Sequence, residues 1–148
     1  MATNNPQKLR VFVDADVLFA ASASASEQGA SLVILRLAEV TLIEAIASEQ
    51  VIIEVERNLA DKLPATLPTF RLLVDRCLDI VPSPAPDQLA PFAGLADPKD
   101  RSILAAVLNR CPWLVSFNVR HYQPGHSDVT VLTPGEFIRR VRHLLSSL

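Results

Sequence analysis

Residues 10–21 read RVFVDADVLFAA, and this stretch decides the fold. The run VFV at 11–13 is β-branched and aromatic with apolar residues at every position, which is typical of a strand buried on both faces of a sheet. Asp14 follows this run directly, and Asp16 stands two residues further on. Because an unpaired ionised carboxylate is costly in apolar surroundings, Asp14 indicates a compensating group nearby, such as a helix N-terminus, an arginine or a metal.

The rest of the chain alternates strand-like and helix-like segments, which predicts an α/β fold with a largely parallel sheet covered on both faces. Pro-rich residues 82–96 are expected to form a loop, and neither an internal repeat nor a second domain is visible. We expect further strands at 42–48, 79–82, 113–118 and 129–132, and helices at 31–40, 49–63, 67–78, 101–110 and from Pro134 onward.

Composition limits the class of protein. A chain of 148 residues with 49% apolar and 20% charged residues predicts one globular domain and excludes a disordered chain. Four glycines argue against Gly-rich phosphate-binding loops, and Cys77 and Cys111 lie too far apart to indicate a zinc site or a disulfide framework. Without a signal segment or an apolar stretch of about 20 residues, we expect a cytoplasmic protein with no membrane association.

The net charge of −2 is unusual for a protein that binds nucleic acid, because such proteins usually present a basic surface. The balance changes if five acidic residues gather around one metal ion, since 11 acidic residues then remain against 14 basic ones. The mild acidity therefore argues only weakly against a nuclease. The five acidic residues in question are Asp14, Asp16, Glu54, Asp97 and Asp100.

Each candidate also has an ordinary structural explanation, which for Asp14 is capping of the following helix. Asp16 fits helix capping as well as it fits a site. Glu54 alone resembles a solvated helix residue, and Glu49 and Glu56 of the same predicted helix compete with it. Asp97 fits the N-cap of a helix with proline at its first position, whereas Asp100 could turn its carboxylate toward a metal. Asn118 closes a predicted strand at the same sheet edge as Asp14, where ligands gather in parallel sheets, or it is a turn residue.

The order of these segments resembles the PIN-domain family, in particular its VapC-like ribonucleases and toxins. VFVDADVLFAA resembles the family's opening strand with Asp14 as the signature aspartate, and SEQVIIE places the family's glutamate at Glu54. DPKDRSILAAVL matches the third acidic segment, with Asp100 the better match and Asp97 an accessory, and LVSFNVRHY resembles the final strand. The resemblance spans about residues 10–137, and it departs from the family at Asn118, where an aspartate is frequent.

This resemblance implies a single three-layer PIN-like domain over 1–148, with its core at about 10–137 and a C-terminal helix at 134–147. It also implies a metal-dependent endoribonuclease that uses Mg²⁺ or Mn²⁺, for which oxygen ligands are suitable. In the family's arrangement, Asp14 and Asp100 would bind the metal directly, and Glu54 would bind it or orient the attacking water. Asp97 would be an accessory ligand, and Asp97 and Asn118 would hold metal-bound waters. Asp16 and Ser116 would support these groups.

The resemblance further implies an RNA substrate, a homodimer and, for a toxin of a toxin–antitoxin pair, an antitoxin protein as partner. Six basic residues flank the expected site in sequence and are candidates for contacts with phosphate, although any one of them could be an ordinary solvated charge. They are Lys8, Arg10, Lys99, Arg101, Arg120 and His121. Tyr122, in an expected loop, is a better candidate for base stacking than Trp113, which begins a predicted buried strand.

Two other interpretations remain. The D-x-D opening also resembles haloacid-dehalogenase-like phosphatases, in which Asp14 would be the nucleophile and Asp16 the acid/base. That family needs a Ser/Thr strand end and then a lysine, but no lysine follows Lys99 here. The other interpretation is a PIN-like scaffold that binds RNA or protein without cutting, which Asn118 permits.

Overall fold

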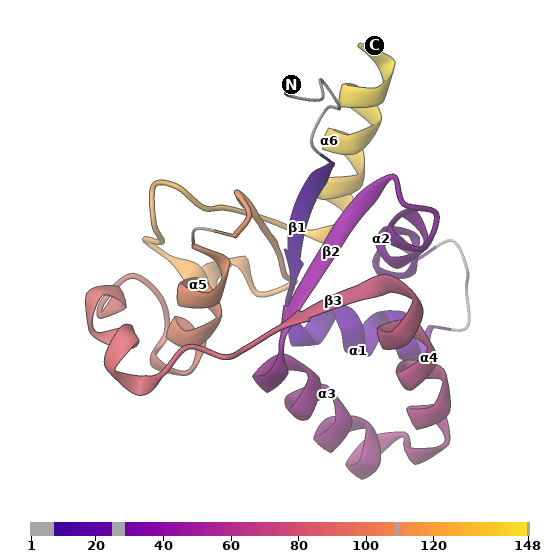
Figure 1. Ribbon diagram of the computed structural model, residues 1–148, viewed down its shortest axis with the longest axis horizontal. Coiled ribbons are helices and arrows are strands. Elements are labelled where there is room, and N and C mark those ends of the chain that lie inside the picture. The colour runs from indigo at the N-terminus through magenta and orange to yellow at the C-terminus, as the bar shows by residue number, and fades with distance from the viewer. Residues whose placement is uncertain (1–7, 25–28, 109, 148) are drawn as a thin grey trace, which may run out of the picture.

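Five strands form the central sheet in the computed structural model, which describes residues 8–24, 29–108 and 110–147. All four strand pairings are parallel, and the strand order is β3-β2-β1-β4-β5 (Figure 1). The expected parallel α/β sheet is therefore confirmed. The strands are β1 (Leu9–Val13), β2 (Ile43–Ser48), β3 (Leu78–Val81), β4 (Trp113–Val115) and β5 (Thr130–Leu132).

Helices cover both faces of this sheet. Helices α1 to α4 pack against one another on one side, α6 packs on α2, and α5 lies on the opposite side of the strands (Figure 1). The three layers follow from right-handed crossovers, since the chain leaves β1 in one direction for β2 and β3 and in the other for β4 and β5. The helices are α1 (Ala15–Ala23), α2 (Ala30–Glu39), α3 (Glu49–Lys62), α4 (Leu67–Cys77), α5 (Arg101–Val107) and α6 (Pro134–Ser146).

The strand order places a topological switch point between β1 and β4, where ligands of parallel sheets usually bind. Residues 11–13 of β1 are fully buried, as the apolar run predicted, so Asp14 begins where this buried strand ends. The N–H of Asp14 donates to the carbonyl of Val115 at 3.0 Å and so extends the β1–β4 ladder by one residue. Asp14 is thereby fixed at the carboxyl edge of the sheet.

Some predicted boundaries differ from the observed ones. Strand β4 ends at Val115 and not at 118, because the next residues turn toward the N-terminus of α1. Helix α5 ends at Val107 and not at 110, because Leu108 leaves the helical conformation with φ −56° and ψ 135°. Residue 109 of that predicted helix lies outside the described residues. The expected loop at 82–96 contains a short 3-10 helix, η2 (Pro86–Phe92).

The core is one continuous cluster between the sheet and its helices. Phe137 of α6 is fully buried and meets the ring of Trp113 edge-on, with centroids 5.6 Å apart. Cys77 and Cys111 are buried free thiols, and burial raises the pKa of each to about 11. Among the residues that the structure describes, no helix has the length and apolar character needed to cross a membrane.

Phe137→Ala should destabilise the protein by about 3–5 kcal/mol, because it removes a buried aromatic ring that joins α6 to the sheet. Urea unfolding followed by circular dichroism measures this change. Leu144→Ala on the same helix is the control, since Leu144 is 46% exposed and its loss should cost less than about 0.5 kcal/mol. Similar losses for the two variants would contradict the proposed anchoring role of Phe137.

Candidate functional site

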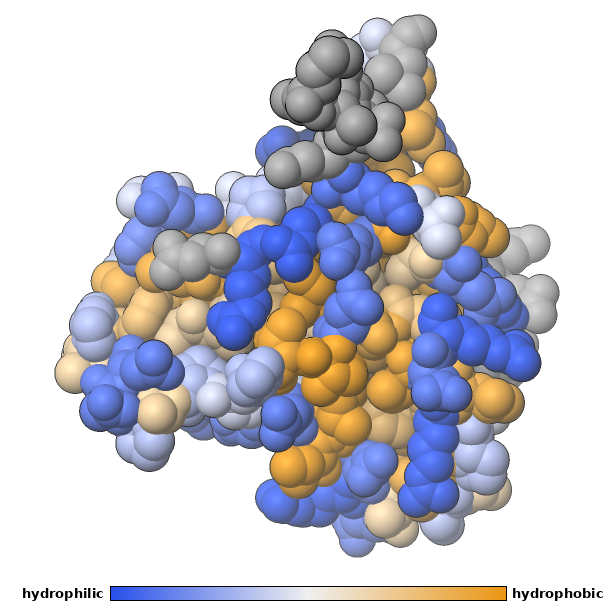
Figure 2. Space-filling view, in the orientation of Figure 1, coloured by the Kyte–Doolittle hydropathy of each residue, from blue (hydrophilic) through white to orange (hydrophobic). Residues whose placement is uncertain are grey.

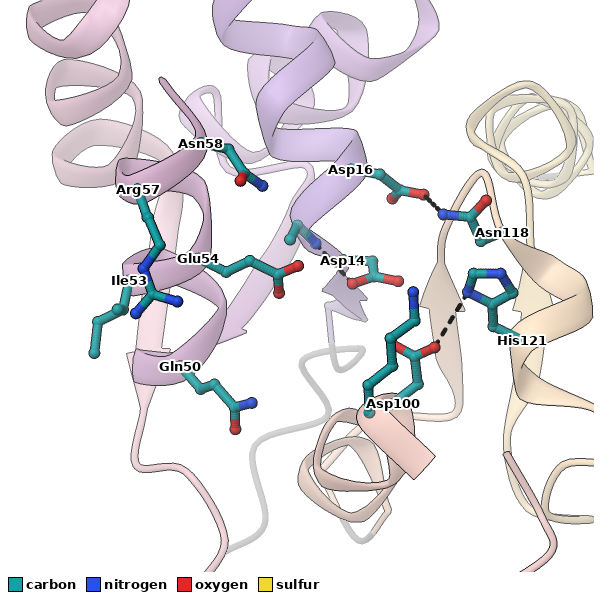
Figure 3. Close-up of a pocket in the computed structure, with 12 residues that line it drawn as sticks. Asp14, Asp16, Gln50, Ile53, Glu54, Arg57, Asn58, Asp100, Asn118 and His121 are labelled. Atoms are coloured by element: carbon teal, nitrogen blue, oxygen red, sulfur yellow. Dashed lines mark hydrogen bonds and ion pairs between the residues drawn. The ribbon is translucent and has the colours of Figure 1, made fainter. Parts of the chain in front are cut away.

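A cleft of about 450 Å³ opens at the carboxyl ends of β1 and β4. Four carboxylates line it, and they come from three parts of the chain that are distant in sequence (Figure 3). Asp14 and Asp16 stand at the start of α1, Glu54 lies on α3, and Asp100 ends the 3-10 helix η3 (Pro98–Asp100). The fold thus brings together these four predicted site residues, and Asn118 lines the same cleft.

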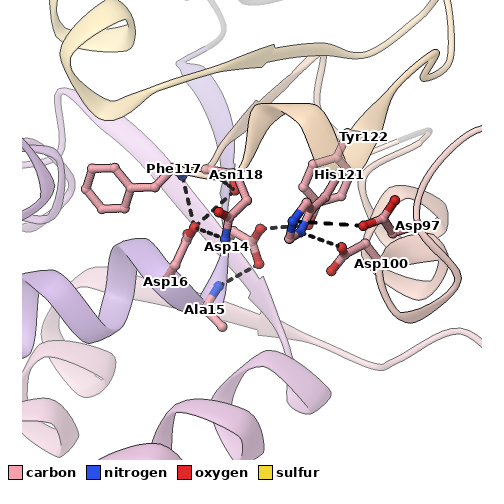
Figure 4. A network of polar contacts seen from close by, with 10 residues as sticks. Asp14, Ala15, Asp16, Asp97, Asp100, Phe117, Asn118, His121 and Tyr122 are labelled. Atoms are coloured by element: carbon pink, nitrogen blue, oxygen red, sulfur yellow. Dashed lines mark hydrogen bonds and ion pairs between the residues drawn. The ribbon is translucent and has the colours of Figure 1, made fainter.

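Asp14 is buried, with 6% of its surface exposed, and both of its carboxylate oxygens accept hydrogen bonds. Oδ1 accepts from the N–H of Ala15 at 2.7 Å, which makes Asp14 the N-cap of α1. Oδ2 accepts from the hydroxyl of Tyr122 at 2.6 Å (Figure 4). Asp14 can therefore cap α1 and also bind a further partner, because one lone pair of each carboxylate oxygen remains free.

Tyr122 is the main residue whose role the sequence did not indicate. It was a candidate for base stacking, but this prediction is wrong because its side chain is buried and only 2% exposed. Burial and then the charge of Asp14 raise the pKa of its phenol far above the usual value, so the hydroxyl stays protonated and donates to Asp14. Its place in a 3-10 helix, η4 (Val119–Tyr122), gave no periodic pattern that could reveal this burial.

Asp16 connects the start of α1 to the segment that follows β4. Its Oδ2 accepts from the Ser116 hydroxyl at 3.3 Å, the Phe117 N–H at 3.0 Å and the Asn118 side-chain amide at 3.0 Å (Figure 4). Its Oδ1 is buried and accepts no hydrogen bond. Burial, followed by the charge of Asp14, raises the pKa of Asp16 to about 6. Ser116 and Asn118 therefore act on the site through Asp16, and Asn118 also lines the cleft.

Glu54 points from α3 into the cleft, toward Asp14 (Figure 3). Burial first, and then the charges of Asp14 and Asp100, raise its pKa. Neither Glu49 nor Glu56, its competitors on the same helix, lines the cleft. Helix α3 owes this placement to its start at Ser48, whose hydroxyl accepts from the N–H of Val51 at 3.4 Å.

Helix α3 also contributes cleft residues that were not predicted. Gln50, Arg57 and Asn58 line the cleft together with Glu54, since residues three or four apart share one helix face. This spacing was available in the sequence once Glu54 had been chosen. Lys99 also lines the cleft, and its charge and that of Arg57 oppose the rise in the Glu54 pKa.

Asp97 and Asp100 have separate positions. Asp100 lines the cleft, and burial followed by the charge of Asp14 raises its pKa. Asp97 lies outside the cleft lining, and it occupies the predicted N-cap position of η3, although its side chain makes no capping hydrogen bond. His121 stands beside both: Nδ1 is 3.2 Å from Asp100 Oδ2, and Nε2 is 3.9 Å from Asp97 Oδ2.

Four of the six candidates for phosphate contact do not line the cleft, namely Lys8, Arg10, Arg101 and Arg120. Arg10 pairs with Glu44 at 3.1 Å and donates to the carbonyl of Arg110 at 2.8 Å, and it does not line the cleft. Its place near the amino end of β1 puts it at the edge of the sheet opposite Asp14. Lys99 and His121 do line the cleft, so contact between these two residues and phosphate stays a prediction.

The donor set fits a divalent cation. Four carboxylates share the cleft, and the pKa values of Asp16, Glu54 and Asp100 are all raised by burial and by the charge of Asp14. Buried Oδ1 of Asp16 and Oδ2 of Asp100 accept no hydrogen bond. Bringing a cation into such a group of oxygen atoms relieves their repulsion, and hard cations such as Mg²⁺ prefer these ligands.

Tyr122→Phe should destabilise the protein by about 1.5–3 kcal/mol, because it leaves a buried carboxylate oxygen of Asp14 without its donor. Ser22→Ala is the control, since Ser22 donates a buried hydrogen bond to the neutral carbonyl of Leu18 at 2.8 Å. We expect a smaller loss for this control in urea unfolding at neutral pH. A loss below about 0.5 kcal/mol for Tyr122→Phe would show that the hydroxyl does not stabilise Asp14.

The raised pKa of Asp16 makes the stability of the metal-free protein depend on pH. Since its folded-state pKa of about 6 exceeds the ordinary 3.8, the contribution of Asp16 is fully present below about pH 3.8. This contribution is lost as the pH rises through about 6. In EDTA, wild type should therefore lose stability relative to Asp16→Asn between about pH 4 and about pH 7.

Urea unfolding at several pH values measures this difference. Asp87→Asn, which changes an exposed carboxyl outside the cleft, should follow wild type over the same range. A constant difference between wild type and Asp16→Asn would contradict the assignment of the titration to Asp16.

Comparisons with known proteins agree with this geometry. The model of a family described as PIN domain matches residues 10–120. Seven chains in solved structures are similar, among them a chain of the crystal structure of VapBC2 from Rickettsia felis bound to a DNA fragment from their promoter. The alignment covers 84% of this chain and 98% of that chain, with 12% identity and a TM-score of 0.62, and at this identity it establishes the fold alone.

A comparison with curated proteins gave no match. The family model, however, covers most of the chain, from the strand that leads to Asp14 through the segment that holds Asn118. The cleft with its four carboxylates lies within the structure formed by the matched residues. The chain therefore belongs to the PIN-domain family.

Proposed function

We propose that this protein is a metal-dependent endoribonuclease, a hydrolase that cuts phosphodiester bonds in RNA. The observation that carries the proposal is the convergence of Asp14, Glu54 and Asp100 on one cleft from β1, α3 and η3. PIN-domain proteins are typically nucleases, and membership of this family supports hydrolysis in general. The choice of RNA rests on the resemblance to VapC-like proteins.

Asp14 and Asp100 would hold the metal directly, with Glu54 and Asp97 as further ligands. Mg²⁺ or Mn²⁺ suits this set, because it consists of carboxylate oxygens. When bound, the cation would lower the pKa of a coordinated water and offset negative charge on the phosphate. Tyr122 would fix the Asp14 carboxylate, since its hydroxyl holds Oδ2 at 2.6 Å.

The other residues of the cleft would position water and substrate. Glu54, whose pKa is raised, suits a general base that orients the attacking water and accepts its proton. Arg57 and Lys99 stand beside the acidic floor and would contact phosphate oxygens of the RNA backbone. Asn118 and Ser116 would keep Asp16 in place through their hydrogen bonds to its Oδ2, and Asn118 and Asp97 would also hold metal-bound waters.

Partners follow from the same resemblance. The similar VapBC2 structure holds its protein on promoter DNA, and we extend to this chain the role of a toxin with an antitoxin partner, in the cytoplasm. A homodimer is also proposed. Figure 2 shows apolar surface near the middle of one face, over the region of β3, where Ile80 is 41% exposed. An exposed apolar edge strand is a surface that another chain can cover.

A non-catalytic scaffold is the second candidate, and Asn118 supports it, because an amide replaces the charge of an aspartate that the family frequently has here. Family membership removes the haloacid-dehalogenase-like phosphatase, in which Asp14 would be a nucleophile. The two remaining candidates differ in whether Asp14 serves catalysis or only the fold.

Purified protein should cut RNA in Mg²⁺ or Mn²⁺ and not in EDTA. Asp14→Asn should lower the cleavage rate by at least about 100-fold, because loss of one charge-stabilising group in an active site has effects of this size. Single-stranded and structured RNA should both be tested, with product lengths resolved on gels. Glu54→Gln should lower the rate as well.

Glu56→Gln is the matched control for Glu54→Gln, because Glu56 lies on the same helix but outside the cleft. It should cut as wild type does. Melting curves with millimolar metal separate the candidates if no RNA is cut. A metal-dependent rise in wild type that Asp14→Asn lacks would indicate an active site whose RNA target was absent, whereas no rise in either would favour the scaffold.

A further inference from the structure

One aromatic side chain of this protein is exposed to solvent, and it belongs to the segment that borders the cleft. The chain has six phenylalanines, one tryptophan and one tyrosine, and all eight lie within the residues that the structure describes. Phe117 is 51% exposed, whereas the other seven are buried or partly buried. Tyr122, the earlier candidate for base stacking, is buried, and the ring of Trp113 packs against Phe137.

Hydrogen bonds to one carboxylate fix the backbone of Phe117. Its N–H donates to Oδ2 of Asp16 at 3.0 Å, and the side chains of its neighbours Ser116 and Asn118 donate to the same oxygen. The N–H of Asn118 also donates to the hydroxyl oxygen of Ser116 at 3.0 Å. Because Asp16 lines the cleft, these bonds hold the ring of Phe117 at a defined place relative to it.

The ring lies beside the cleft and not inside it. Asp16 and Asn118 line the cleft, while Phe117 does not. Figure 4 shows the ring of Phe117 pointing away from Asp14 and Asp100. The space over the carboxylates is therefore left free. Because the base and the phosphate of a nucleotide are joined through one ribose, a phosphate held over the carboxylates places a neighbouring base near the rim.

The charge of the cleft makes a contact of this kind valuable for binding. Four carboxylates line the cleft, and the basic side chains among the described residues that line it with them are Arg57, Lys99 and His121. Contacts with phosphate usually supply much of the affinity for nucleic acid, and an acidic cleft weakens this source. Stacking of a base on an aromatic ring needs no charge, and every base has a face that can stack.

We propose that Phe117 is a stacking platform for an unpaired base of the RNA, next to the phosphate that enters the cleft. This inference rests on the proposed function, since it takes RNA as the substrate, and it adds a preference for single-stranded regions. In a duplex the bases stack on one another, so they are not free to lie on the ring. Paired RNA therefore gains no affinity from Phe117.

Binding of a labelled single-stranded RNA, followed by fluorescence anisotropy in Ca²⁺, tests the platform, and gels check that the RNA stays intact. Phe117→Ala should weaken binding by at least about fivefold, the lower end of what one stacked base contributes. The change keeps the backbone N–H that donates to Asp16. Leu72→Ala is the matched control, since Leu72 is also 51% exposed but lies on α4, outside the cleft. It should bind RNA as wild type does.

Two further variants separate stacking from a general apolar contact. Phe117→Trp should bind single-stranded RNA at least as tightly as wild type, because its ring also stacks. Phe117→Leu, which is apolar but not aromatic, should lose about as much affinity as Phe117→Ala. A Phe117→Leu variant that binds as wild type does would contradict stacking. Circular dichroism checks the fold of each variant.

Duplex RNA of the same sequence is the control on the side of the substrate. Wild type and Phe117→Ala should bind it equally. The ratio of their affinities for the single strand should stay constant as salt rises, because the ring carries no charge. Equal affinity of the two proteins for single-stranded RNA would overturn the proposal and would leave the ring as a contact for a protein partner.

Failure of this proposal can be distinguished from failure of the proposed nuclease. If wild type binds single-stranded RNA through Phe117 but cuts none in Mg²⁺ or Mn²⁺, the platform stands and the nuclease does not. If wild type cuts RNA and Phe117→Ala binds it as tightly, the nuclease stands and the platform does not. Absence of single-stranded RNA binding by wild type would also overturn the platform.

Discussion

Asp14 stands at the end of the central strand with 6% of its surface exposed. The hydrogen bonds that fix its carboxylate also fix its position relative to the other carboxylates of the cleft. Asp16, Glu54 and Asp100 share the same cleft, and burial, followed by the charge of Asp14, raises the pKa of each. Mutual repulsion of this kind costs stability in the metal-free protein. The fold persists because hydrogen-bond donors face these oxygens, and a cation would offset the remaining charge.

Most of these donors come from one short segment, residues 116–122, which follows β4. Tyr122 donates to Asp14, while Ser116, Phe117 and Asn118 donate to Asp16. His121 faces Asp97 and Asp100 from the same segment. The sheet brings this segment to the acidic residues, because β4 is the neighbour of β1. A change in the segment therefore affects both the stability of the fold and the geometry of the cleft.

Much of the site could be predicted from local patterns. The buried run before Asp14 and the Pro-containing turn before Asp100 are visible in the sequence, and parallel strands place their carboxyl ends at one edge. Glu54 could be chosen over Glu49 and Glu56 only through the family resemblance, since all three fit a helix. The other cleft residues of α3 then follow from helical spacing. Without Glu54, however, no pattern in the sequence indicates which face of α3 lines the cleft.

By itself, the sequence determined the alternation of strands and helices, the parallel sheet and the acidic residues at strand and helix ends. These depend on periodicity and on nearest neighbours along the chain. Only the tertiary structure decided that Tyr122 is a buried donor to Asp14 and that His121 stands between Asp97 and Asp100. Tyr122 and Asp14 are 108 positions apart. A contact between such distant residues leaves no periodic pattern, because the packing of the whole sheet brings them together.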